Sequence, residues 1–414
     1  MTTFPKLKLK VRDYLDELSE ELTLGTKLPY NFARENLKLM ALAALPRDAA
    51  RPVLPWFPKI HRRQYLIVIS DTPGVGKGET FRRLKATVDK SEQERLPWFV
   101  EFIAGESLGS PQWACVQFGG ERGKKGEAVK RPVPGIDVVI DQPGRLVHFD
   151  EGKRLLQQDV TGKTERGLVT MFTQLFESNE HTMGSFAHGS AGVWQANVSL
   201  ILHFTRSGFE AAFTGAGATS SGFLSRCTLV AEEAQSVKGD WRIVDSRRVK
   251  EHVEKLRECT GREELTQEDG VDAVRQKLYE EIAQADPLHA ARLQFLFAQD
   301  LYARGLFSKD GVISKEAAEM AAHWTRHQMQ LRAEVWPLDQ SANVSERIYL
   351  VLSKALKQSS GLTFRDMKRA CHTDRAGSGG ITMLNMVLRS MRAAGEIAVV
   401  GRNNAGREIF GWVG

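Results

Sequence analysis

The chain has 414 residues, of which 42% are hydrophobic and 26% are charged. At roughly 150 residues per domain this length predicts two to four domains, and the composition excludes a mainly disordered, collagen-like or disulfide-stapled protein. The apolar runs at 65–69 and 198–204 are far shorter than the ~20 residues of a membrane helix. The N-terminus has no apolar signal-peptide core, and the four cysteines include no C-x-x-C pair. We therefore expect a cytoplasmic protein with no membrane partner.

The excess positive charge lies at the C-terminal end of the chain. Overall, 57 Lys and Arg residues face 51 Asp and Glu residues, which gives a net charge of +6. Residues 341–414 hold 11 basic and 5 acidic side chains, and 11 − 5 = +6, so this segment carries the whole excess. A small basic domain is typical of a protein that binds a polyanion, most often a nucleic acid. A solvated basic face is the alternative.

Residues 1–62 are expected to form a helical segment, because apolar residues recur at helical spacing between 10 and 50. In residues 63–235, short apolar runs alternate with Gly-rich turns and amphipathic pieces, which is the pattern of an α/β core. The runs YLIVIS, RLVHFD and VSLILHF are predicted to be buried strands. Residues 236–338 are mostly charged and helical, and the polar SANVSE after Pro337 indicates a linker.

Residues 339–414 are expected to form a separate domain. They are predicted to hold three helices, SERIYLVLSKALKQ, TFRDMKRACH and GITMLNMVLRSMRAAG, and two strands, EIAVVG and REIFGWV, joined by RNNAG. Three helices followed by a β-hairpin form the winged-helix version of the helix-turn-helix. Such a module usually lays its third helix in the major groove of DNA. A winged helix that contacts only protein is the alternative.

A strand, a Gly-rich loop and a helix follow one another in YLIVIS-DTPGVGKGET, and this order predicts a site for nucleotide phosphates. The glycines let backbone N–H groups turn inward, and the helix N-terminus adds partial positive charge. Lys77 would reach the β- and γ-phosphates. Asp71 replaces the first Gly of G-x-x-x-x-G-K-[ST], and Gly78 replaces the hydroxyl that normally binds Mg²⁺, for which either Thr80 or water would substitute. The residues expected to bind ATP are Pro73, Gly74, Val75, Gly76, Lys77, Gly78, Glu79 and Thr80.

A second acidic motif follows in GRLVHFDEG, which has the form of a Walker B strand. Asp150 at the strand end is expected to hold a water bound to Mg²⁺, and Glu151 is expected to act as the general base for the attacking water. A kinase, which excludes water, has no use for the second carboxylate. An exposed acidic pair without a function is the alternative reading.

Residues 63–230 resemble an AAA+ ATPase, and more specifically the minichromosome-maintenance helicase core and related helicase-like ATPases of phages and mobile elements. The loop PGVGK is similar to the family's P-G-x-A-K segment. Residues 105–144 resemble its G-L-T segment and helix-2 insert hairpin, and residues 175–205 resemble its pre-sensor-1 hairpin and sensor-1 strand. FLSRC at 223–227 resembles the arginine-finger segment, and the helical stretch 285–325 resembles the lid.

The resemblance implies roles for single residues. Arg226 would be an arginine finger that completes the ATP site of a neighbouring subunit. Thr205 stands at the position of the family's sensor-1 Asn, and Arg292 is a candidate for the sensor of the lid. His188, at the hairpin tip, stands where the family has a Lys that grips DNA. The remaining candidates for nucleic-acid contacts are Lys124, Lys125, Lys130 and Arg131 in the insert, and Arg375 and Arg402 in the C-terminal domain.

The sequence thus predicts an α/β protein, with an AAA+ P-loop ATPase core, β-hairpin inserts, a helical lid and a C-terminal winged helix. The expected function is that of an ATP-driven DNA helicase or translocase, with ATP and Mg²⁺ as cofactors and a homo-oligomeric, hexameric ring as its assembly, acting in the replication of a phage or mobile element. One alternative is an ATP-switched DNA-binding initiator or loader with weak hydrolysis, which the missing hydroxyl at Gly78 keeps open. A nucleotide kinase is the other.

Overall fold

The chain divides into two compact units, one of residues 1–213 with 217–331 and a smaller one of 214–216 with 332–414. The computed structural model describes residues 12–23, 29–45, 63–70, 78, 81–82, 85, 100–124, 129, 144–158, 167–178, 180–185, 189–213, 223–232, 246–262, 265–286, 289–335, 344–371, 384–385, 387–389, 391–392, 395–403 and 406–413.

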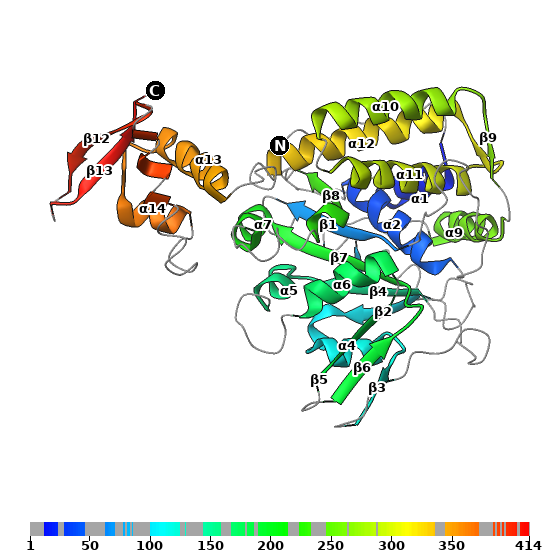
Figure 1. The fold of residues 1–414 in the computed structure, drawn as a ribbon. Helices are drawn as coiled ribbons and strands as arrows, with labels where there is room; N and C mark the ends of the chain where they lie inside the picture. The colour runs from blue at the N-terminus through cyan, green and yellow to red at the C-terminus, as the bar shows by residue number, and fades with distance from the viewer. Residues whose placement is uncertain are drawn as a thin grey trace. The chain divides into compact units, whose positions relative to one another are not determined.

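The core of the larger unit is a five-stranded sheet in the order β2-β4-β7-β1-β8 (Figure 1). Every neighbouring pair of strands is parallel. The strands are β1 (Tyr65–Ser70), β2 (Val100–Ala104), β4 (Gly144–Phe149), β7 (Val198–Thr205) and β8 (Cys227–Glu232). The three predicted strands are confirmed as β1, β4 and β7, and the α/β class is confirmed with them. Because β7 lies between β1 and β4, the carboxyl ends of these three strands lie side by side.

Helices cover both faces of this sheet. Helix α2 (Tyr30–Ala44) packs on the face that carries Leu66, Leu146 and Ile201, all of which belong to one buried cluster with apolar residues of α2. On the opposite face, the hydroxyl of Tyr65 donates to the carbonyl oxygen of Phe172 in α6 (Gly167–Ser178) at 2.6 Å. Burial of both faces explains why these strands are continuous apolar runs.

The larger unit contains further helices among the described residues. They are α1 (Tyr14–Thr23), α4 (Pro111–Gln117), α5 (Lys153–Gln158), α7 (Arg206–Phe213), α9 (Ser246–Thr260), α10 (Val271–Ala285), α11 (Ala290–Leu306) and α12 (Lys315–Val335), with short 3-10 turns η2 (Gly105–Ser107) and η3 (Leu224–Arg226). Strands β9 (Thr266–Gln267) and β10 (Val312–Ile313) form a parallel pair. Gln328 of α12 covers the edge of the sheet, because its side-chain amide accepts from the backbone N–H of Leu229 at 2.9 Å and donates to the Leu229 carbonyl at 2.7 Å.

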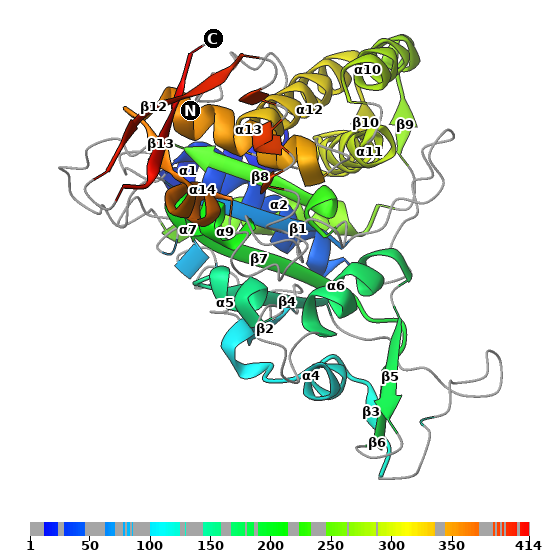
Figure 2. The same ribbon diagram turned by 60° about the vertical axis from the view of Figure 1, so that its left-hand side comes forward.

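A second, smaller sheet projects away from the core sheet (Figure 2). Strands β5 (His181–Ser185) and β6 (Gly189–Val193) form an antiparallel hairpin, and β3 (Glu121–Arg122) pairs with the outer side of β6. The hairpin expected between 175 and 205 is therefore observed, and β3 and Val129 lie beside it. The backbone N–H of Val129 donates to the side-chain oxygen of Ser190 at 2.7 Å.

A buried network of charges ties the N-terminal helices to α11. The guanidinium of Arg34 pairs with Asp16 at 2.6 Å and with Asp13 at 3.1 Å, and the ammonium of Lys38 pairs with Asp300 at 2.8 Å. The buried charged side chains here are Asp13, Asp16, Arg34, Glu35, Lys38, Asp300 and Arg304. The set holds one more carboxylate than cations, and burial, together with the nearby Asp16 carboxylate, raises the pKa of Asp13 to about 7.

The smaller unit has its own apolar core. It contains α13 (Val344–Lys357), β11 (Leu362–Thr363), α14 (Phe364–Ala370), helical residues at 384–385, 387–389 and 391–392, then β12 (Ile397–Arg402) and β13 (Glu408–Trp412). The strands form an antiparallel sheet in the order β11-β13-β12. Leu352, Met367 and Leu388 come from the three helical segments and are buried in one cluster. The predicted order of three helical segments and a hairpin is observed, and β11 was not predicted because only two residues of it pair with β13.

Candidate functional site

Gly78, at the end of the Gly-rich loop, lies close to Asp150, the acidic residue directly after β4. Gly78 is helical, and a Cβ atom placed on it would lie 3.6 Å from Oδ1 of Asp150. Strand β1, which leads into the loop, ends at Ser70, and β4 ends at Phe149, with β7 between them. The fold therefore brings the end of the predicted phosphate loop and the predicted Walker B carboxylate together, at the edge of an open parallel sheet where ligands commonly bind.

The two acidic residues after β4 are exposed. The side chain of Asp150 is 76% exposed and that of Glu151 is 64% exposed. Nε of Arg154 donates to Oε2 of Glu151 at 3.2 Å, one helical turn further along the chain. An ion pair between such exposed groups contributes little to stability. Both carboxylates are thus accessible, and Glu151 can exchange Arg154 for another partner at small cost.

Thr205 lies at the carboxyl end of β7, between the ends of β1 and β4. Its side-chain oxygen accepts the backbone N–H of Gly208 at 3.1 Å. Thr205 directly precedes α7, so this bond caps the helix N-terminus. The capping bond gives Thr205 a structural role that the sequence analysis did not foresee.

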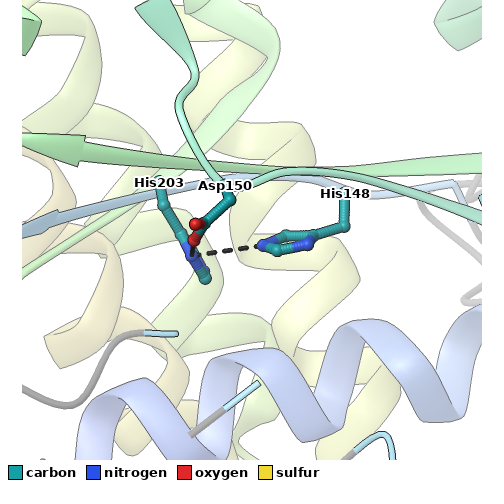
Figure 3. Close-up of side chains that lie close together, drawn as sticks. All are labelled: His148, Asp150 and His203. Atoms are coloured by element: carbon teal, nitrogen blue, oxygen red, sulfur yellow. Dashed lines mark hydrogen bonds and ion pairs between the residues drawn. The ribbon is translucent and has the colours of Figure 1, made fainter. Parts of the chain in front are cut away.

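Two histidines lie beside Asp150 on the same face of the sheet (Figure 3). His148 and Asp150 are two residues apart at the end of β4, and residues at this spacing point to the same side of a strand. Nε2 of His148 is 3.2 Å from Nδ1 of His203 in β7, and this Nδ1 is 3.6 Å from Oδ1 of Asp150. The three donor atoms all lie within 4.8 Å of one another.

Packing fixes the two imidazoles. The ring of Phe81 stacks on that of His148 with 3.9 Å between centroids, and the His203 side chain is fully buried. Burial lowers the pKa of His148 to about 3, with further lowering by His203 and Lys85 against the opposing effect of Asp150. The His148 ring is therefore neutral near pH 7. The segment after Asp150 is held to β7 because the backbone N–H of Gly152 donates to the carbonyl oxygen of His203 at 2.8 Å.

Arg226 lies at the opposite edge of the sheet. It ends the η3 turn just before β8, and the first residue of β8, Cys227, aligns with the first residue of β1, Tyr65. A six-residue strand such as β1 spans about 17–20 Å. Arg226 is therefore separated by about the length of a strand from the edge of the sheet where Gly78 meets Asp150.

At the amino ends of the strands, Arg226 and Arg292 share one carboxylate. Nε of Arg226 pairs with Oε1 of Glu177 at 2.8 Å, and Nη2 of Arg292 pairs with the same oxygen at 2.5 Å. Burial and the neighbouring Arg292 lower the pKa of Arg226, although a guanidinium remains charged at any physiological pH. The structure brings the predicted finger and the predicted lid sensor together, through a partner that sequence reasoning missed.

Two of the predicted nucleic-acid contacts are among the described residues. Lys124 follows β3, where the backbone N–H of Gly123 donates to the carbonyl oxygen of Ser190 at 2.8 Å, so Lys124 lies at the β5–β6 hairpin. Arg402 is exposed at the end of β12, where the hairpin of the smaller unit turns. The other predicted contacts, His188, Lys125, Lys130, Arg131 and Arg375, lie outside the described residues, as do Pro73, Gly74, Val75, Gly76, Lys77, Glu79 and Thr80 of the predicted ATP site.

Sequence reasoning also passed over His148 and His203. A signal for them is present, because β4 ends in VHF with Asp150 directly after it and β7 ends in LHFT, so that in both places a His-Phe pair precedes a polar residue. The register of β4 against β7 shows why the two His-Phe pairs matter. Phe149 aligns with Leu202 on adjacent strands, so the next pair in register is Asp150 with His203.

No protein-family model matches the chain, and no curated protein matches it. Within the described part of the chain, no helix is both long and apolar enough to cross a membrane.

Proposed function

We propose that this protein is an AAA+ ATPase that assembles into a ring and uses ATP to unwind DNA or move along it. The observation that carries the proposal is the position of Gly78 beside Asp150, at the carboxyl ends of parallel strands. There, Lys77 and the backbone N–H groups of residues 74–80 would bind the phosphates, and the Asp150 carboxylate would hold Mg²⁺, directly or through a bound water. Glu151 accepts a proton from the attacking water.

The residues near Gly78 and Asp150 supply some, but not all, of the oxygen ligands that Mg²⁺ prefers. Magnesium is held by carboxylates, water and phosphate oxygens, and Asp150 supplies an exposed carboxylate. Gly78 supplies no hydroxyl, so water and the nucleotide would provide the remaining oxygens. Mg²⁺ bound to ATP would neutralise negative charge that develops on the transferred phosphoryl group.

The position of Arg226 supports the proposed assembly into a ring. A guanidinium at the amino edge of the sheet is about a strand length from its own chain's phosphate site, so it can stabilise a transferred phosphoryl group only in a neighbouring subunit. The shared carboxylate of Glu177 would hold Arg226 and Arg292 in place until a neighbour docks.

DNA is the proposed partner for two reasons. The β5–β6 hairpin projects from the core with Lys124 beside it, and residues 341–414 of the smaller unit carry the whole excess of positive charge. Its three helical segments and hairpin fit a winged helix. Lysine and arginine side chains in such places bind phosphates without regard to base sequence.

The test is the rate of ATP hydrolysis by the full chain with and without single-stranded DNA, together with its mass by light scattering in the presence of ATP. We expect hydrolysis that DNA stimulates and a mass of several subunits. A protein that stays monomeric under all these conditions would contradict the ring. Binding of ATP with assembly but little hydrolysis would instead support an ATP-switched initiator, which the absence of a hydroxyl at Gly78 favours as the second candidate.

A further inference from the structure

We propose that His148, Asp150 and His203 form a binding site for a divalent transition-metal ion, such as Zn²⁺, Mn²⁺ or Co²⁺, with open coordination positions on the side of Gly78. Binding of the ion depends on these three side chains alone. Its part in catalysis rests on the proposed ATPase function.

The spacing of the donor atoms fits a common ion. Metal–nitrogen bonds of about 2.0–2.1 Å place two ligands of a tetrahedral ion about 3.3 Å apart, and His148 Nε2 lies 3.2 Å from His203 Nδ1. The carboxylate oxygen of Asp150 is 3.6 Å from this Nδ1. All three donor atoms lie within 4.8 Å of one another, and rotation of the exposed Asp150 side chain can bring its oxygen closer to both nitrogens.

The scaffold around these atoms is rigid. All three residues come from the ends of two adjacent parallel strands, which are held in register by backbone hydrogen bonds. Phe81 fixes the ring plane of His148, and the bond from Gly152 to the His203 carbonyl holds the turn after Asp150. Ligands positioned on strands and locked by packing bind an ion without a large cost of ordering.

The kind of ligand selects the kind of ion. Imidazole nitrogen suits Zn²⁺ and its transition-metal neighbours, whereas Mg²⁺ prefers an all-oxygen environment. Two imidazoles and one carboxylate fill three positions and leave others for water or for phosphate oxygens. Gly78, whose Cβ position is 3.6 Å from Asp150, lies on the side where a nucleotide phosphate would approach. The two imidazoles would thus replace the hydroxyl ligand that the loop lacks.

The experiment is a titration of the full-length protein, stripped of metal and nucleotide, with Co²⁺ alone, followed by visible absorption. We expect bands that saturate at one ion per chain. The affinity for Co²⁺ should fall by about tenfold or more in Asp150→Asn and in His148→Gln. Even the loss of a residue that only supports a metal ligand lowers metal affinity by about 10–100-fold. Asp150→Asn changes an exposed side chain and is expected to fold. Thermal unfolding of each variant checks that folding is intact.

His289→Gln is the matched control. It removes another imidazole that pairs with a carboxylate, since His289 Nδ1 is 3.0 Å from Asp286, but this pair has no second imidazole among the described residues at the site. Co²⁺ affinity should be unchanged in this variant. Absence of bands in the parent, or equal Co²⁺ affinity in the parent, Asp150→Asn and His148→Gln, would overturn the proposal and leave an ordinary hydrogen bond between two histidines.

The outcomes also separate this site from the proposed function. Co²⁺ binding that depends on His148 and Asp150, in a protein that neither binds nor hydrolyses ATP, would support the metal site and contradict the ATPase. Hydrolysis supported by Mg²⁺ together with no Co²⁺ binding would support the ATPase and contradict the metal site. If both hold, Mn²⁺ should support a faster rate than Mg²⁺ in the parent, and this preference should be lost in His148→Gln.

Discussion

Arg226 donates to Glu177 at 2.8 Å, at the amino edge of the sheet, whereas Gly78 meets Asp150 at the carboxyl edge. The two places belong to one chain but are about a strand length apart, so a catalytic partnership between them requires two subunits. The ion pair also supplies a purely structural explanation for Arg226. A mutation at Arg226 alone does not separate the two explanations, and a mixture of variants does.

Arg226→Ala is expected to bind ATP but to hydrolyse it poorly, because loss of a finger can cost on the order of 10³ in rate. Lys77→Ala should also be inactive. Mixed rings contain interfaces in which an intact Lys77 faces an intact Arg226, so mixing the two variants should restore part of the activity, measured as phosphate release.

Glu177→Gln is the control for this mixture. If the only role of Arg226 is its ion pair with Glu177, Glu177→Gln should lower the rate of ATP hydrolysis as much as Arg226→Ala does. Mixing Arg226→Ala with Lys77→Ala should then restore no hydrolysis. If Arg226 acts on a neighbour, Glu177→Gln should retain most of the activity, since the guanidinium is still present.

Gly78→Ser is expected to raise Mg²⁺-dependent hydrolysis. The added Cβ would lie at an ordinary contact distance of 3.6 Å from Asp150, and the hydroxyl would supply the ligand that the loop lacks. Gly78→Ala is the matched control, because it adds the same Cβ and stabilises the helix by up to about 1 kcal/mol without a ligand. Equal rates in the two variants would show that the hydroxyl position has no part in metal binding.

Asp13 should make stability depend on pH. Its folded-state pKa of about 7 is above the ordinary value of 3.8, so its contribution is fully present below pH 3.8 and is lost as the pH rises through 7. Asp13→Asn keeps the oxygen that accepts the Asp16 N–H at 2.7 Å. We expect this variant to melt at a higher temperature than the parent at pH 8, with little difference at pH 4, in thermal unfolding followed by circular dichroism.

Asp16→Asn should behave in the opposite way. Although burial opposes ionisation of Asp16, the guanidinium of Arg34 at 2.6 Å prevails and lowers the pKa of this carboxyl. Loss of its charge should destabilise the protein at pH 8. Destabilisation by both substitutions at pH 8 would mean that the folded protein stabilises the ionised Asp13 carboxylate, which would contradict its raised pKa.

The smaller unit should carry a separable DNA function. Deletion of 341–414 should weaken duplex binding and flatten its salt dependence, since each lost phosphate contact removes about 0.9 from the log–log slope. Hydrolysis without DNA should survive. In the double variant Arg375→Ala/Arg402→Ala, the dependence of duplex affinity on salt concentration should also become less steep. Unchanged affinity over a salt series would leave this unit as a protein-docking module.

The sequence predicted those elements whose signal is local. Runs such as YLIVIS and VSLILHF are apolar on both faces because helices cover both sides of the sheet, and they were recognised as strands for that reason. Thr363 and Asp366 form a capping box at the start of α14, which the same local chemistry explains. The order of the strands is not local, because it depends on which apolar runs pair across long stretches of chain.

The same distinction applies to the site. Asp150 and Gly78 were predicted from their own motifs, but their contact depends on strand order. The pair of Arg226 with Glu177 joins residues 49 positions apart and has no local signal. His203 and His148 were overlooked because a single histidine in an apolar run is usually a core residue, and only the register of β4 against β7 shows that the two meet.

Glu151→Gln distinguishes a hydrolytic nucleotide site at the carboxyl ends of β1 and β4 from a site that only binds nucleotide. Binding and hydrolysis of labelled ATP should be measured side by side in the parent, in Lys77→Ala and in Glu151→Gln. We predict that the parent binds and hydrolyses ATP, that Lys77→Ala does neither, and that Glu151→Gln binds ATP and retains it unhydrolysed. Hydrolysis by Glu151→Gln at the parental rate would contradict the account.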